Sequence, residues 1–210
     1  MDRIPKLFLI IIVLSALASC GIFFTPMDGR WNPIDPKNEL LAFNPTIDGY
    51  AHNVTPVPSP DTWEGDLTQL LAWKDSKIIL LRFDTADFPR VVAASFLRLW
   101  LVETPANNTK LSIYRIKNDW QPNDDFYRTV NQPGVFYDDS QVTNFTVSSS
   151  ESADKYIEIP LGEVFKGERD KLANGILIYS DYNGALTFLS KESGDIIGNG
   201  SPPLLLVEPE

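Results

Sequence analysis

The stretch Phe96-Leu97-Arg98-Leu99-Trp100-Leu101-Val102 decides the fold class of this chain. Its three leucines fall on one side of an extended backbone, while Arg98 and Trp100 fall on the other side. An alternation with a period of two residues predicts a strand that buries one face and leaves the other at the surface. The stretch therefore predicts a β-strand at the boundary of a hydrophobic core.

Short apolar runs of this kind recur from about residue 44 to the end of the chain. Further strands are expected at residues 45–50, 77–83, 110–116, 155–159, 175–179, 186–189 and 203–207. Turn-forming residues separate them, as in Asn131-Gln132-Pro133-Gly134 and Gly198-Asn199-Gly200. Only residues 161–172 suggest a helix, and a short one. Many short strands without a long helix predict an all-β sandwich or barrel.

Residues 1–19 are expected to be a signal peptide. Charged residues at the start precede an apolar run at 7–14, and small residues follow it. The run is too short to cross about 30 Å of hydrocarbon as a helix, and the three-part pattern is typical of secretion signals. Leu17-Ala18-Ser19-Cys20 resembles the lipobox of bacterial lipoproteins, in which the cysteine is acylated and becomes the new N-terminus.

The lipobox resemblance implies a lipid on Cys20 that anchors the exported protein in the cell envelope, at the outer membrane or the cell surface. Each buried CH₂ of an acyl chain contributes roughly 0.8 kcal/mol, so several chains hold a protein stably. An ordinary signal peptide that happens to contain a cysteine is the alternative. Residues 20–43, with prolines and no sustained period, are expected to form a lipidated tether, and residues 44–210 to form the domain.

The composition argues against several classes of function. Cys20 is the one cysteine, so the acylated chain has no thiol for a disulfide or a Cys-based metal site. A formal net charge of −10 argues against nucleic acid as a partner. His52 is the one histidine, and no serine lies in a nucleophile-elbow motif, so we expect no catalysis. A glycosidase that works with two carboxylates stays an open alternative.

Six blocks of sequence, in order, resemble the DNRLRE-type domain family, which includes disaggregatase-related repeats and alginate-binding carbohydrate-binding modules. The blocks are residues 45–50, 80–84 with 94–99, 113–116 with Trp120 and 130–134, 174–178, 188–192 and 202–207. The resemblance covers roughly residues 44–208 and implies a jelly-roll-like antiparallel β-sandwich that binds polysaccharide or serves as an accessory module at the cell surface. Val130 departs from the second Trp of many members, and the loop 123–127 is not the usual Thr-rich one, so a ligand site there would be altered.

Aromatic side chains are the candidates for sugar binding, because the apolar C–H face of a pyranose packs on a flat ring. The candidate rings are Trp63, Trp100, Trp120 and Tyr127, and Arg98 is a further candidate for sugar binding through its charge. Arg98 would meet an acidic sugar or form a cross-strand pair with a carboxylate. Packing in the core is the alternative for each ring.

Asp61, Glu64 and Asp66 are candidate ligands for a structural Ca²⁺ ion, which takes six to eight oxygen ligands. A solvated acidic loop is the alternative for the same residues.

Taken together, the sequence predicts a membrane-anchored, non-catalytic surface lipoprotein that binds polysaccharide of the envelope or matrix. The alternative is a structural or assembly module that binds another envelope protein.

Overall fold

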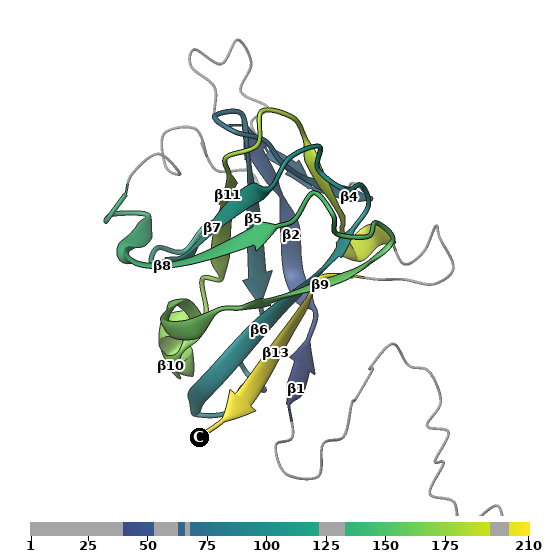
Figure 1. Cartoon of the computed structure of the whole chain (residues 1–210). Helices are drawn as coiled ribbons and strands as arrows, with labels where there is room; N and C mark the ends of the chain where they lie inside the picture. Colours follow the sequence, from purple (N-terminus) through teal and green to yellow (C-terminus); the bar gives the residue numbers. More distant parts are fainter. Residues whose placement is uncertain (1–39, 53–62, 66–67, 122–132, 194–201) are drawn as a thin grey trace, which may run out of the picture. The chain divides into compact units, whose positions relative to one another are not determined.

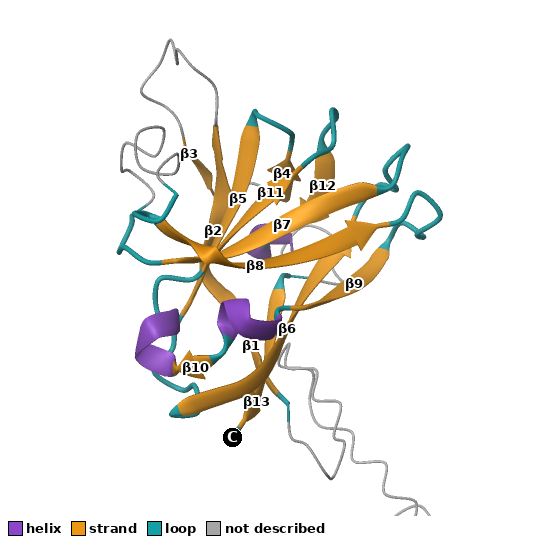
Figure 2. Ribbon diagram, turned by 60° about the vertical axis from the view of Figure 1, so that its left-hand side comes forward, coloured by secondary structure: helices purple, strands orange, loops and turns teal. Residues whose placement is uncertain are grey.

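The computed structural model describes residues 40–52, 63–65, 68–121, 133–193 and 202–210. In this part of the chain, two antiparallel sheets pack against each other (Figures 1 and 2), which confirms the predicted all-β sandwich. None of the described helical segments has the length and apolar character needed to cross a membrane. Residues 1–19, expected to be a signal peptide, and Cys20 lie outside the described residues.

One sheet, here called sheet A, has the strand order β1-β13-β6-β12-β4, and β9 and β10 also pair with β6. Its strands are β1 (Leu41–Phe43), β4 (Gln69–Ala72), β6 (Val91–Leu101), β9 (Lys155–Pro160), β10 (Gly167–Glu168), β12 (Leu186–Leu189) and β13 (Leu204–Pro209). β6, which contains the alternating leucines, pairs with β9, β10, β12 and β13 and is the strand around which this sheet is built.

The second sheet, sheet B, has the order β3-β2-β5-β11-β7-β8. Its strands are β2 (Pro45–His52), β3 (Trp63–Gly65), β5 (Lys77–Phe83), β7 (Thr109–Ile116), β8 (Tyr137–Val147) and β11 (Ile176–Ser180). The chain passes repeatedly from one sheet to the other, for example from β4 to β5 to β6 to β7, which gives the sandwich its jelly-roll-like character.

The described residues include three short 3₁₀ helices, η1 (Gly162–Phe165), η2 (Arg169–Leu172) and η3 (Lys191–Ser193). The single short helix suggested at residues 161–172 is therefore wrong: η1 and η2 occupy this stretch, with β10 between them. Gly167 lies between the two with a φ of +110°, a conformation that ends one helical turn before the next begins.

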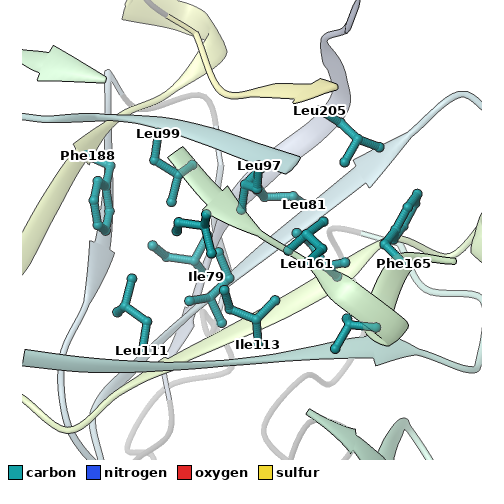
Figure 3. Close-up of a cluster of buried hydrophobic side chains, with 14 of the residues drawn as sticks. Ile79, Leu81, Leu97, Leu99, Leu111, Ile113, Leu161, Phe165, Phe188 and Leu205 are labelled. Atoms are coloured by element: carbon teal, nitrogen blue, oxygen red, sulfur yellow. The ribbon is translucent and has the colours of Figure 1, made fainter. Parts of the chain in front are cut away.

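The main core lies between the two sheets (Figure 3). Ile79 and Leu81 of β5 point from sheet B toward Leu97 and Leu99 of β6, and all four side chains are fully buried. At one end of this core Phe165 of η1 packs on neighbouring rings. Alternate residues of β5 and β6 thus supply the apolar layer that the sequence predicted.

A second cluster of buried side chains covers the other face of sheet B. Ile78 and Leu80, which alternate with the core residues of β5, lie in it together with Leu177. Trp120 and Phe136, from the chain on either side of residues 122–132, also belong to the cluster. This second layer explains why the apolar run at residues 77–83 is continuous rather than alternating.

Several strands differ from the sequence expectations, and β3, β4 and β10 lie where no strand was expected. The boundary at residue 44 is wrong, because Leu41–Phe43 form β1, which pairs with β13. The Phe43 ring also packs on Phe88, with centroids 4.3 Å apart. No strand was expected at Tyr137–Val147, yet β8 is one of the longest described strands; its largely polar residues at the edge of sheet B gave no apolar pattern.

Candidate functional site

The outward face of sheet A carries the strongest candidate for a binding surface. On β6, Leu97, Leu99 and Leu101 are fully buried in the core, while Arg98 and Trp100 between them are partly exposed. The predicted two-faced strand is therefore confirmed. The neighbouring strand β9 has the same alternation, because Ile157 and Ile159 are buried.

Trp100 and Tyr156 form an aromatic pair on this face. They are direct partners in the β6–β9 ladder, with ring centroids 5.2 Å apart and planes at 84°. The Tyr156 hydroxyl donates a hydrogen bond to the Pro202 carbonyl oxygen at 3.0 Å. An edge-to-face contact and a hydrogen bond both restrict the rotation of these rings.

Arg98 and Glu158 form an ion pair one step further along the same ladder. The Nε and Nη2 atoms of Arg98 each lie 2.7 Å from Oε2 of Glu158. The side chains are 23% and 45% exposed, so solvent reaches both. No described group donates to Oε1 of Glu158, which leaves that oxygen as an acceptor.

Arg98, Trp100, Tyr156 and Glu158 together are called the β6–β9 patch below. The strand β13 pairs with β6 on the side away from β9. In this β6–β13 ladder Leu204 lies opposite Arg98 and is 9% exposed. The patch thus combines two oriented rings and a charged pair beside an apolar strand. Such a surface suits a sugar, whose C–H face packs on a ring while its hydroxyl groups bond to carboxylate and guanidinium.

The prediction that Trp120 binds a sugar is wrong. Its side chain is 1% exposed, and its indole Nε1 donates to the Asn174 carbonyl oxygen at 2.8 Å. Arg82 holds the backbone of this residue, because its Nη1 donates to the Trp120 carbonyl oxygen and its Nη2 pairs with Asp119, both at 2.8 Å. Trp120 is therefore part of the layer that covers sheet B.

Several predicted site residues are not placed with their side chains. Tyr127, Asp61 and Asp66 lie outside the described residues. Trp63 and Glu64 belong to β3, where their backbones pair with Ala51 and Tyr50 of β2, and nothing more of them is described. The Ca²⁺ site and the contribution of Trp63 stay predictions. Among the residues that the structure describes, no three potential metal ligands come together.

The arginines of the strands each have a carboxylate partner. The cross-strand pair that was one alternative for Arg98 is present, with Glu158. On sheet B, Arg115 pairs with Asp138 at 2.9 Å. Hydrogen bonds from Ser140, together with Arg115, lower the pKa of the Asp138 carboxyl below its usual value. Asp138 thus stays ionised well into the acid range.

A second group of rings, Tyr114, Tyr137 and Tyr179, lies on the outward face of sheet B. Their centroids are 4.8 to 6.1 Å apart. Burial raises the pKa of Tyr137 and of Tyr179, whose hydroxyls also share a hydrogen bond. Because Tyr137 is only 8% exposed, we assign this group to packing rather than to ligand binding.

Comparison with known proteins gives no assignment. No family model matches the chain, and no curated protein matches it. The resemblance to DNRLRE-type domains and to lipoproteins therefore stays a prediction.

Two members of the β6–β9 patch were not candidates from the sequence. Tyr156 and Glu158 alternate with Ile157 and Ile159, so the sequence did place them on one strand face. Nothing local in the sequence shows that β9 pairs with β6, and only that pairing brings Tyr156 beside Trp100. The pairing of residues more than fifty positions apart is the missing information.

Proposed function

We propose that this protein is an exported, lipid-anchored and non-catalytic surface protein that binds polysaccharide on the outward face of sheet A. The observation that carries the proposal is the oriented pair of Trp100 and Tyr156 beside the ion pair of Arg98 and Glu158. These four side chains form one surface at neighbouring positions of a single ladder.

The two halves of the β6–β9 patch have different roles in this proposal. The rings supply apolar contact area at little entropic cost, because their orientation is already restricted. Arg98 and Glu158 supply directional hydrogen bonds to hydroxyl or carboxylate groups of the sugar. A surface strand face of this kind would hold an extended chain and leave its glycosidic bonds intact.

Affinity electrophoresis of the full chain in detergent, through gels that contain single polysaccharides, tests the binding. Trp100→Ala should weaken retardation by at least tenfold in Kd, which corresponds to about 1.4 kcal/mol. Trp73→Ala is the matched control, because Trp73 is an exposed tryptophan (40%) outside the patch. Equal losses in the two variants would point to nonspecific adsorption and contradict the proposal, as would turnover of the polysaccharide.

The lipid anchor is tested separately. Labelling of cells with a palmitate analogue should mark the wild-type protein and should not mark Cys20→Ala. The variant should also leave the membrane fraction, since the acyl chains supply the attachment. A labelled Cys20→Ala variant would contradict the anchor without affecting the binding site.

The second candidate function, assembly with another envelope protein, is favoured by one observation. Among the described strands β8 is one of the two edges of sheet B, it is 11 residues long, and its Val142 is 41% exposed. A long edge strand offers unpaired backbone groups to a partner strand. A protein that co-purifies with the wild type and is lost on Val142→Pro, with no retardation by any polysaccharide, would favour this candidate.

A further inference from the structure

A buried carboxylate ties the two sheets together. Asp48 lies on the core face of β2 in sheet B and is 3% exposed. Its Oδ2 accepts a hydrogen bond of 2.7 Å from the backbone N–H of Lys191. Lys191 begins η3, which directly follows β12 of sheet A. Asp48 is therefore the attachment point of η3 on the opposite sheet.

Glu192, the next residue of η3, carries a second carboxyl group that acts electrostatically on Asp48. Oδ1 of Asp48 and Oε2 of Glu192 are both buried, and neither has a hydrogen-bond donor among the described residues. Two ionised carboxylates in this arrangement would repel each other and leave two acceptors unsatisfied. One proton between them satisfies both oxygens.

The charged groups around the pair do not replace that proton. The Lys191 ammonium lies 3.3 Å from Oε1 of Glu192 and donates to the Thr46 carbonyl oxygen at 2.7 Å. The strand β4 has no ionisable side chain. On β5, Lys77 binds the Tyr50 hydroxyl, and Arg82 pairs with Asp119. Among the described side chains, one cation, the Lys191 ammonium, therefore faces the two carboxyl groups.

We propose that Asp48 carries a proton, donates it in a hydrogen bond to Glu192, and thereby forms a pH-operated clamp that holds η3 against β2. This clamp is independent of the proposed polysaccharide binding and adds a conformational response to the fold. When the proton leaves, repulsion between the two carboxylates favours detachment of η3 and local opening of the sandwich at this point.

The direction of the pH dependence follows from the environment of Asp48. Burial, with a further contribution from Glu192, raises the pKa of Asp48 from 3.8 to about 7. Below the pKa that Asp48 has in the unfolded chain, its carboxyl is protonated in both the folded and the unfolded state, and the clamp contributes its full stability. That contribution is lost as the pH rises toward and through about 7, so the clamp opens on the alkaline side.

Thermal unfolding of the full chain in detergent between about pH 5 and pH 9 tests the clamp. Asp48→Asn keeps an acceptor for the Lys191 N–H and supplies a permanent donor to Glu192. The Tm difference between Asp48→Asn and wild type should increase with pH and then level off above the pKa of about 7. Asp170→Asn, at a side chain that is 92% exposed, is the control, and its Tm difference should stay constant.

A direct titration of the wild type tests the clamp without any substitution at Asp48. The ¹³C carboxyl resonance of Asp48 in the wild type should titrate near neutral pH, and amide exchange at Lys191 should rise over the same range, beyond the intrinsic increase seen at a control amide. Glu192→Gln removes the second carboxyl and offers an amide donor to an ionised Asp48, so it should move both transitions to lower pH. A Tm difference that does not vary with pH, or an Asp48 resonance that titrates near its ordinary value of 3.8, overturns the clamp.

Discussion

Trp100 on β6 and Tyr156 on β9 lie directly opposite each other, with ring planes at 84° and centroids 5.2 Å apart. The two rings come from strands that are separated by more than fifty residues in the sequence. Their contact fixes the register of β9 on β6 and, in the same step, orients the rings that we propose for ligand binding.

The Tyr156 hydroxyl should contribute measurably to stability. Tyr156→Phe removes its hydrogen bond to the Pro202 carbonyl oxygen and should lower the free energy of unfolding by about 1 kcal/mol. Urea denaturation measures this change. Tyr114→Phe is the control, because the Tyr114 hydroxyl has no described hydrogen-bond partner. Equal effects of the two variants would show that the Pro202 contact has no energetic role.

The Arg98–Glu158 pair should matter more for binding than for folding. Glu158→Gln should change the free energy of unfolding by less than about 1 kcal/mol, because solvent reaches both side chains. It should weaken retardation in polysaccharide gels, since a carboxylate acceptor is lost. Glu163→Gln, which also removes the charge of an exposed glutamate paired with a cation, is the control and should bind like wild type. Normal binding by Glu158→Gln would exclude the ion pair from the site.

Trp120 and Trp73 should separate the effects of burial and exposure. Trp120→Ala empties the layer over sheet B and should cost about 3 to 5 kcal/mol of unfolding free energy. Trp73→Ala should cost less than about 1 kcal/mol, because this side chain is exposed. Guanidinium denaturation of both variants measures the difference. A small effect of Trp120→Ala would contradict the assignment of this ring to the second cluster.

Gly175 should be intolerant of any side chain. It adopts a φ of +84°, and a Cβ there would lie 2.0 Å from the Leu81 carbonyl oxygen. Gly175→Ala should therefore cost more than about 3 kcal/mol, or prevent folding. Gly167→Ala is the comparison, since Gly167 also has positive φ but has open space around a Cβ, and it should cost roughly 1 to 3 kcal/mol. If the two costs are equal, the close approach to Leu81 is not the cause.

The sequence predicts the strands of this fold well where an apolar pattern exists. The range predicted for β5 agrees with Lys77–Phe83, and the alternation at Leu97, Leu99 and Leu101 predicts the inner face of β6. The edge strand β8 was missed, because an edge position with few buried side chains needs no such pattern. Hydrophobic periodicity therefore detects the central strands of a sheet more readily than its edge strands.

The candidate site was predictable only in part. Alternation along β6 placed Trp100 and Arg98 at the surface, whereas the burial of Trp120 depends on the chain around Asn174, which is 54 residues away. The pairing of Glu158 with Arg98 likewise depends on strand register. The same applies to Asp48, an ordinary acidic residue in the sequence that becomes a buried link between sheets only through η3. These contacts join residues that are far apart in the sequence, and the local hydrophobic pattern does not show which distant segments pair.

The indole N–H resonances of the five tryptophans provide the most direct test of the proposed binding surface. In ¹H–¹⁵N spectra of the full chain, assigned with Trp100→Phe and Trp120→Phe, isolated envelope polysaccharides are added one at a time. We expect the Trp100 indole signal to shift with a bound polysaccharide, while the signal of the buried Trp120 stays in place. A polysaccharide that binds without moving the Trp100 signal, or a Trp100 signal that no polysaccharide moves, would contradict the proposal.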